Sequence, residues 1–198
     1  IGLNCLIHPT SVIGLVPFEE IMEVAPVRIG NAVHIGAFCV IESGVFIGDR
    51  VKIAHHVVIA LGAEIGSDSL IVDAVRIDRR ALVGKNCVIG GNVSDRAVIG
   101  DNVTFMGEMA HSYSDATEPW ETTDEISPII HRGTVVAQGA QIIGGISIGE
   151  GSYIAAGEIV RFDVPPHSFV SGGGKVRPVS SMRGLVRSRL DPTSGQLT

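Results

Sequence analysis

The hydrophobic residues of this chain recur at intervals of six. Starting at residue 29, eleven successive positions six residues apart hold Ile or Val: Ile29, Ile35, Ile41, Ile47, Ile53, Ile59, Ile65, Ile71, Ile77, Val83 and Ile89. Gly follows six of them, and the residue four places after each is small or β-branched. A fixed period over so many units indicates a repeat architecture.

The six-residue period favours short strands over helices. In an α-helix a step of six residues advances about 240°, which would scatter the apolar residues over three sides of the cylinder. In a strand, residues i and i+4 share one face, and polar residues between them, such as Asn31, Ser43 and Asp49, can occupy a corner. The pattern predicts a β-solenoid with coils about 4.8 Å apart and a core of stacked Ile and Val.

The hexads resemble those of the hexapeptide-repeat acyltransferases. This resemblance implies an all-β, left-handed parallel β-helix with three hexads in each triangular coil. At about 18 residues per coil, the run from Ile29 to Ser94 gives nearly four coils. The resemblance also implies a homotrimer with its sites between subunits, because neighbouring copies would cover the flat apolar faces of the prism.

The repeat is interrupted at two places and changes phase at a third. Residues 15–26 lose the register after a first coil and predict a surface excursion, and residues 112–127 predict an external loop of a length that is usually functional. Between them, Ile99 follows Ile89 by ten residues where two hexads would give twelve. One coil is therefore predicted to be two residues short.

The solenoid is expected to end at residues 163–166, because the two prolines there have no amide hydrogen to donate to the ladder. We predict one continuous β-helix acyltransferase domain over residues 1–170, followed by a C-terminal extension over residues 171–198. Apolar residues at helical spacing between Val179 and Leu190 predict a short amphipathic helix within that extension.

Composition and charge exclude some classes of binding partner and indicate the cellular compartment. A net charge of −6 gives no basic surface for nucleic acid, and no apolar stretch approaches the roughly 18 residues needed to cross a membrane. Of the three cysteines, Cys39 and Cys87 take inward positions and Cys5 lies in the first coil. We therefore expect buried thiols and a reducing, cytoplasmic location in preference to disulfides.

His111 is the first candidate for catalysis, because it stands directly before the loop at a position where the register requires an apolar residue. The C-terminal half resembles the sugar O-/N-acetyltransferases and xenobiotic acetyltransferases of the family, in which a histidine beside an external loop removes a proton from the acceptor. The resemblance implies that His111 is this base, a task for which imidazole is suited. The alternative is a histidine that caps the coil before the loop.

A base of this kind is usually oriented by a carboxylate or carbonyl on its other nitrogen. Asp95 precedes His111 by 16 residues, so in a coil two residues short it is predicted to lie almost directly beneath His111, about 5 Å away. Glu108 is the rival for this role. The alternative for either residue is a solvated corner carboxylate.

Three later segments, residues 136–140, 154–157 and 160–166, resemble the acyl-CoA-binding coils of the family. Small outward residues let a pantetheine arm lie along the backbone, although small residues also suit tight corners. The residues implied for this contact are Ala137, Gly139, Ala155 and Ala156. Arg161 and Lys175 are implied to meet the nucleotide phosphates of CoA.

The external loop is acidic and aromatic, with five carboxylates and no Lys or Arg. Its negative charge would attract an amine-bearing acceptor, and an aromatic side chain could stack on a sugar. We predict that Glu108, Tyr113 and Trp120 contact the acceptor. The alternative is that the acidic residues only keep the loop solvated and bind no acceptor.

A metal site is the second class of hypothesis, because a zinc hydrase of the γ-carbonic-anhydrase type is built on the same solenoid. Such a site needs two histidines four residues apart and a third from a distant coil. His34, His55, His56 and His131 contain no such pair, so no metal is expected.

The sequence thus favours a CoA-dependent acyltransferase that moves an acetyl group from acetyl-CoA to a hydroxyl or amine. The acceptor would be a sugar, a nucleotide sugar or an antibiotic-like molecule. The competing hypotheses are the metalloenzyme and a non-catalytic assembly protein whose solenoid only packs against partners.

Overall fold

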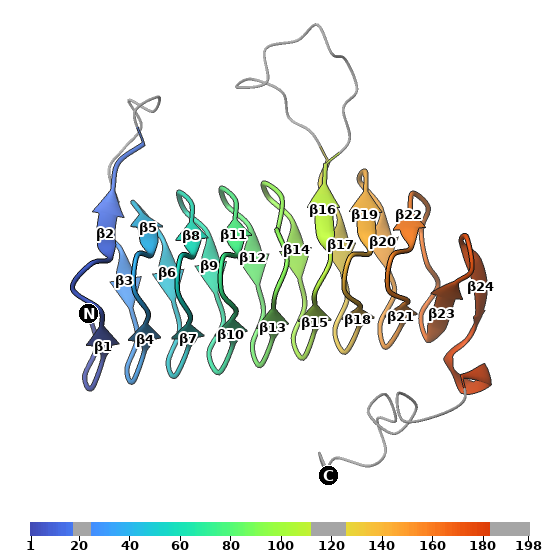
Figure 1. Cartoon of the computed structure of the whole chain (residues 1–198), viewed down its shortest axis with the longest axis horizontal. Coiled ribbons are helices and arrows are strands. Elements are labelled where there is room, and N and C mark those ends of the chain that lie inside the picture. The colour runs from blue at the N-terminus through green and yellow to red at the C-terminus, as the bar shows by residue number, and fades with distance from the viewer. Residues whose placement is uncertain (18–24, 112–125, 183–198) are drawn as a thin grey trace, which may run out of the picture.

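The computed structural model describes residues 1–17, 25–111 and 126–182 of the chain. These residues form an elongated stack of coils, with the first residues at one end and the last described strands at the other (Figure 1). Apart from one short 3-10 helix, η1 (Val179–Ser181), the regular elements of the described residues are all β-strands. The predicted all-β solenoid is confirmed.

Face A is the longest of the three faces of the stack. It is a ten-stranded sheet in which each strand pairs in parallel with one from a neighbouring coil, except for the antiparallel pair at its C-terminal end. Its strands are β1 (Leu6–Ile7), β4 (His34–Ile35), β7 (Lys52–Ile53), β10 (Leu70–Ile71), β13 (Val88–Ile89), β15 (Thr104–Phe105), β18 (Val135–Val136), β21 (Tyr153–Ile154), β23 (Ser168–Ser171) and β24 (Lys175–Pro178).

Faces B and C complete the triangle. Face B consists of β2 (Val12–Leu15), β5 (Val40–Glu42), β8 (Val58–Ile59) and β11 (Arg76–Ile77), followed by β16 (Glu108–Ala110), β19 (Gln141–Ile143) and β22 (Ile159–Val160). Face C consists of β3 (Arg28–Ile29), β6 (Phe46–Ile47), β9 (Glu64–Ile65), β12 (Leu82–Val83), β14 (Val98–Ile99), β17 (Ile129–Ile130) and β20 (Ser147–Ile148).

Each coil turns through three corners, which we name AB, BC and CA after the faces that they join. The three residues after each inward strand residue are its first, second and third corner residues. The third commonly has a positive φ, as in Phe38 and Arg50, both at 58°. Many first corner residues are Gly because a side chain would collide with the next coil: a Cβ at Gly30 would lie 2.5 Å from Asp49 Oδ1.

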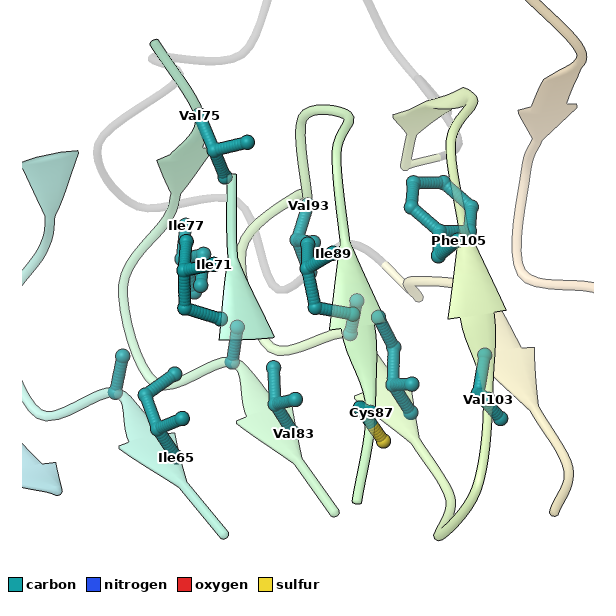
Figure 2. Packing of buried hydrophobic residues seen from close by; sticks show 14 of the residues in the cluster. Ile65, Ile71, Val75, Ile77, Val83, Cys87, Ile89, Val93, Val103 and Phe105 are labelled. Carbon is teal, nitrogen blue, oxygen red and sulfur yellow. The ribbon is translucent and has the colours of Figure 1, made fainter. Parts of the chain in front are cut away.

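The hexad residues form the core, as predicted. Ile35, Ile53, Ile71 and Ile89 stack in one ladder, and residues four places later, such as Val57 and Val75, are fully or almost fully buried as well. Figure 2 shows Ile65, Ile71, Ile77, Val83 and Ile89 directed into the interior from successive strands. Burial of each such side chain contributes about 1.5–3 kcal/mol.

The predicted short coil is also confirmed. Leu70 pairs with Val88, 18 residues away, whereas Val88 pairs with Thr104, 16 residues away. The same step of 16 joins Leu82 to Val98 on face C. In the first interruption, residues 18–24 lie outside the described part of the chain, so the excursion predicted there stays a prediction.

The prediction that the ladder ends at residues 163–166 is wrong by one strand. β23 continues face A with Val170 beside Ile154, and β24 then folds back along it. Pro165 and Pro166 take the first two positions of a CA corner in the last coil. Elsewhere the amides of these positions donate to the next coil, as Gly30 N does to Ile47 O at 2.8 Å. Among the described residues no further coil follows this corner, so proline costs no ladder hydrogen bond there.

Two sequence predictions remain to be compared with the structure, the C-terminal helix and the buried thiols. Of the predicted helix, the structure describes only the start, where η1 forms, and residues 183–190 lie outside the described residues. Cys39 and Cys87 are buried free thiols, as expected, and burial raises the pKa of Cys87. In the described residues no helix is long and apolar enough to span a membrane.

Candidate active site

Both interruptions of the repeat begin at the BC corner. β2 precedes the first and β16 the second, and the two strands rise to the same long edge of the stack (Figure 1). His111 directly follows β16 at this edge and is half-buried. The external loop and the predicted base therefore belong to one corner of the solenoid.

The ladder places Asp95 and His111 at equivalent positions of adjacent coils. Ile77 bridges Val93, and Met109 N donates to Asn92 O at 3.1 Å, which sets 93 beside 109. Asp95 and His111 are the second corner residues that follow. The prediction that His111 takes an apolar position of the register is therefore wrong, because Met109 takes the inward position beside Ile142. The 16-residue offset thus holds for Val93 and Met109. Beyond the corner, Ile129 lies beside Val98 and Ser127 contacts Asp95, so the distance of about 5 Å between Asp95 and His111 stays a prediction.

The carboxylate of Asp95 is held by the coil on its other side. Its Oδ1 accepts a hydrogen bond of 2.8 Å from the backbone N–H of Arg79, and its Oδ2 lies 3.3 Å from the guanidinium of Arg79. The Asp95 carbonyl also accepts a hydrogen bond from the Ser127 hydroxyl. A carboxylate has about four lone-pair sites, so these contacts leave capacity for a further donor. The orienting role of Asp95 stays a prediction.

His55 shows how a histidine can cap a coil. It is the second corner residue of an AB corner, and its Nδ1 accepts a hydrogen bond of 2.8 Å from the backbone N–H of Ala37 in the coil below. In this tautomer the proton is on Nε2, which can donate but not accept. The two hypotheses for His111 therefore differ in tautomer, because a base that accepts through Nε2 needs its proton on Nδ1.

Glu108 stands on the outer surface of the small sheet β16–β19–β22. It is exposed, and its neighbours in the ladder are Gln141 and then Ile159. This sheet separates the BC corner, which carries His111, from the AB corner. Glu108 is therefore placed between the predicted base and the predicted CoA-binding residues, and its contact with an acceptor stays a prediction.

The predicted pantetheine residues share the AB corner in two successive coils. Ala137 N donates to Ile154 O at 2.9 Å, and Gly157 N donates to Gln138 O at 3.2 Å, so Ala155 and Ala156 lie over the preceding corner. Gly139 and Gly157 have φ of 72° and 71°, with open space where a side chain would project.

The same corner is covered near the N-terminal end. There the third corner residues Phe38 and His56 stack their rings with centroids 5.2 Å apart. Along the AB corner the surface thus changes from stacked rings to bare backbone. A thin chain such as a pantetheine arm can approach only bare backbone closely.

The two predicted phosphate contacts are on different corners. Arg161 follows β22 at the BC corner, whereas Lys175 begins β24 beside Ser171, on the AB side of the stack. Both side chains are exposed. The neighbouring Arg177 lies over the Phe169 ring at 5.3 Å and donates a hydrogen bond of 2.6 Å to Ser171 Oγ.

Two predicted substrate residues, Tyr113 and Trp120, lie outside the described residues, as do the loop carboxylates.

In the part of the chain that is described, no three His, Cys, Asp or Glu residues are grouped to hold a metal. His131 Nε2 instead lies 3.0 Å from Ser147 Oγ. A surface hollow lined by Leu6, His8 and His34 belongs to the first coils, several coils away from His111.

Sequence reasoning missed Glu158, which occupies an inward position yet carries a carboxylate. Its Oε1 and Oε2 accept hydrogen bonds from the amides of Gly173 and Gly174. The signal was present, because position 158 lies four after Ile154, where the hexad rule expects a small or β-branched residue.

The chain matches two repeat families. Residues 26–61 match "Bacterial transferase hexapeptide (six repeats)", and residues 74–105 match "Hexapeptide repeat of succinyl-transferase". Each match covers coils on the N-terminal side of His111.

Curated relatives match in sequence. UDP-3-O-acylglucosamine N-acyltransferase of Bordetella pertussis is 32% identical over 108 residues, covering 52% of this chain and 30% of that protein. Serine acetyltransferase of Salmonella typhimurium is 30% identical over 128 residues, covering 65% of this chain and 40% of that protein. The chain therefore spans less than half the length of these two relatives.

A solved structure, that of LpxA from Acinetobacter baumannii, has the same fold. Its TM-score to this chain is 0.60 at 14% sequence identity, and the alignment covers 98% of this chain and 77% of LpxA. The fold is thus the left-handed parallel β-helix. Taken together with the repeat matches, the relatives agree with the family resemblance of the hexads.

Proposed function

Because the repeats match two hexapeptide-repeat transferase families and the curated relatives are acyltransferases, we propose that the chain is a CoA-dependent acyltransferase. The donor would be acetyl-CoA, and the acceptor a hydroxyl or amine of a sugar, nucleotide sugar or antibiotic-like molecule. The observation that carries the proposal is the position of His111. It directly follows β16 at the loop-bearing corner, and the sheet β16–β19–β22 lies between it and the bare AB corner.

In the proposed reaction, His111 removes the proton from the acceptor while the acceptor oxygen or nitrogen attacks the thioester carbonyl. Backbone amides stabilise the oxyanion of the tetrahedral intermediate. The intermediate collapses with cleavage of the carbon–sulfur bond, and the imidazolium returns its proton to the CoA thiolate. No cysteine nucleophile takes part, which fits the burial of Cys39 and Cys87.

The donor would lie along the AB corner. Open space over Gly139 and Gly157 supports this placement of the pantetheine arm, with Ala137, Ala155 and Ala156 beside it. Arg161 and Lys175 are on different corners of one chain, so one CoA molecule would meet both most simply if neighbouring copies contributed them. We therefore propose a homotrimer with each site between two copies.

Apolar side chains exposed on the flat faces support this assembly. They include Phe46, Leu70, Leu82, Ile129 and Ile159. Side chains of this kind, spread over flat faces, mark surfaces that a second copy can cover. We also propose a cytoplasmic location, because the free buried thiols suit a reducing compartment.

Release of free thiol from acetyl-CoA in the presence of a panel of acceptors tests the function. Acceptor-dependent release by the purified chain, lost in His111→Ala, is the expected result. A chain that folds and assembles but never consumes acetyl-CoA with any acceptor would overturn the proposal. Metal content and hydration of carbon dioxide would then separate a metalloenzyme from an assembly protein.

A further inference from the structure

Three histidines line one surface hollow at the N-terminal end of the stack. The hollow has a volume of about 400 Å³ and lies over β1, β4 and β7, which are neighbours on face A (Figure 1). His8 follows β1, His34 lies in β4, and His55 is the second corner residue after β7. Pockets for small ligands have volumes of about 300–1,000 Å³. The hollow is therefore large enough for a small organic molecule.

Two of the three imidazoles are fixed as hydrogen-bond donors. His55 Nδ1 accepts from the amide of Ala37 at 2.8 Å. His8 Nδ1 accepts from the amide of Thr10 at 3.3 Å and lies 2.9 Å from Thr10 Oγ1, which itself accepts from the amide of Phe38. An amide hydrogen on Nδ1 places the ring proton on Nε2, so each ring offers one N–H group and no free lone pair. A metal ligand needs that lone pair, so these two rings suit an acceptor oxygen and not a metal ion.

The two donors come from the coils on either side of one glycine corner. His8 N donates to Ile35 O at 2.9 Å, which places His8 beside Gly36 of the second coil. The ring of His55 reaches back to the same corner from the third coil. A Cβ on Gly36 would lie 2.9 Å from His55 Nδ1, so glycine leaves the room that the ring needs. The first and third coils are about 10 Å apart, and a group with two acceptor atoms can form hydrogen bonds of about 2.8 Å at both ends of this gap.

The rest of the hollow is mainly apolar. Among the described residues that line it there is no carboxylate, arginine or lysine. Leu6 lines it and is 65% exposed, and the ladder of face A places His34 between Leu6 and Lys52. Lys52 thus adds one positive charge beside the hollow. The carboxylate of Asp73 lies on the other side of His55, where its Oδ1 accepts from the His55 amide at 2.7 Å.

We propose that this hollow binds the carboxylate of a small organic acid, with His8 and His55 as donors and the apolar part of the acid against Leu6 and Pro9. A carboxylate carries one charge and two acceptor oxygens, which matches two N–H groups and one neighbouring lysine. A phosphate carries more charge and is typically bound by arginine or by several cations. The hollow is several coils away from His111 and from the bare AB corner, so the inference does not depend on the proposed function.

The first test is an NMR titration of the histidine ring resonances in the isotope-labelled chain at neutral pH. Hexanoate is the probe, and hexylamine, with the same apolar chain and the opposite charge, is the control ligand. Hexanoate should shift the rings of His8 and His55 to saturation, and hexylamine should not. Absence of saturation, equal binding of hexylamine or tighter binding of inorganic phosphate would overturn the proposal. Ring nitrogen shifts that place the proton on Nδ1 of His8 or His55 would overturn it as well.

The second test measures hexanoate affinity in variants. His8→Ala combined with His34→Ala should lose roughly 10-fold or more, because it removes a donor and a neighbouring imidazole. Leu6→Glu should lose a similar factor, because it places a negative charge at the rim and keeps every imidazole. His167→Ala, which removes an exposed imidazole at the other end of the stack, should bind as the wild type does. His55 is left in place because its ring accepts from the Ala37 amide. Wild-type affinity in either hollow variant would refute the site.

Discussion

Oε2 of Glu158 accepts a hydrogen bond of 2.9 Å from the backbone N–H of Gly174. Oε1 accepts another of 3.1 Å from Gly173, so one carboxylate holds two amides of the turn between β23 and β24. The side chain is only 9% exposed and takes an inward position at the last AB corner. The β23–β24 hairpin that closes the C-terminal end of the stack is thus tied to the core by a buried charge.

Replacement of Glu158 by Ala should destabilise the fold by about 2–4 kcal/mol, because it removes two charge-assisted hydrogen bonds and leaves two amides without their acceptor. Chemical denaturation would measure the loss. Glu150→Ala is the control, since Glu150 forms an exposed ion pair with Arg132 at 2.9 Å, worth less than about 1 kcal/mol. Equal unfolding midpoints for the two variants would contradict the role of Glu158.

The core register is tested by a matched pair of substitutions. Ile65 is fully buried, so Ile65→Asp places an unpaired carboxylate in the stack and should cost several kcal/mol, on the order of 3–5. Asp49→Asn keeps a carbonyl oxygen to accept the 2.7 Å hydrogen bond from Asn31 N and should cost well under about 1 kcal/mol. Thermal melting compares them, and similar curves would refute the inward assignment of Ile65.

His111→Ala should lower turnover by roughly 10² to 10⁴ while it leaves acetyl-CoA affinity almost unchanged, because the imidazole acts on the acceptor. His55→Ala is the matched control from another corner. It removes the acceptor of the Ala37 amide and should reduce stability but not turnover. Full turnover in His111→Ala at neutral pH would show that another residue is the general base, with His131 the next residue to test.

If Asp95 orients His111, Asp95→Asn should lower turnover by less than His111→Ala does. The double variant should then be scarcely slower than His111→Ala alone, because an orienting residue has no effect once the base is gone. Asparagine keeps an acceptor for the Arg79 amide, so the fold should survive. Additive losses in the double variant would show that Asp95 acts independently of His111.

Asp78 should make stability depend on pH. Burial, the largest cause, raises the pKa of Asp78 above its ordinary value of 3.8, and the nearby Arg76 only partly opposes it. The folded state therefore favours the protonated carboxyl. Its stabilising contribution is fully present below pH 3.8 and is lost as the pH rises through the folded pKa.

The measurement for Asp78 is the difference in unfolding free energy between the wild type and Asp78→Asn, taken by urea denaturation across this range. The difference should shift against the wild type as the pH rises. A difference that is constant, or that shifts the other way, would refute the raised pKa. Asp49→Asn, compared with the wild type over the same range, controls for solvent effects on carboxylates at corners.

The homotrimer predicts a particle of about three times 20.8 kDa by light scattering at micromolar concentration. Leu82→Glu and Ile129→Glu place charge on the apolar part of face C and should shift the particle toward monomer, because an unpaired charge is costly in an interface. Thr104→Glu, on face A, tests whether the effect is specific to face C. A monomeric wild type would contradict the assembly and a site shared between copies.

The spacing of Ile29 to Ile89 was sufficient to predict strands, corners and inward residues, and the ten-residue step from Ile89 to Ile99 predicted the short coil. Each of these follows from local sterics repeated along one axis, so a period in the sequence becomes a period in space. Positions that depend on the ends of the stack were harder to predict from the sequence. Pro165 is tolerated because, among the residues that the structure describes, no later coil needs its amide. Glu158 is buried because a hairpin supplies its donors.

The candidate site was predicted less completely. The hexad count alone would have placed Arg161 and Lys175 on different corners. Two residues lie on the same corner only when a whole number of coils separates them along the chain, and these two are less than one coil apart. Contacts of Tyr113 and Trp120 depend on a segment without any repeat, so periodicity says nothing about them.

The interruptions at the BC corner bear on how such a protein can be re-engineered. Leu6 pairs with His34 across 28 residues and Val98 with Ile129 across 31, which exceed an 18-residue coil by 10 and 13. Neither excess is a multiple of six, yet the strands beyond each return to register. Closure is set by the faces on either side and not by the number of residues inserted. Since doubling a loop costs only about 0.6 kcal/mol in closure entropy, this edge should accept grafted loops of arbitrary length, a natural place to exchange specificity between scaffolds.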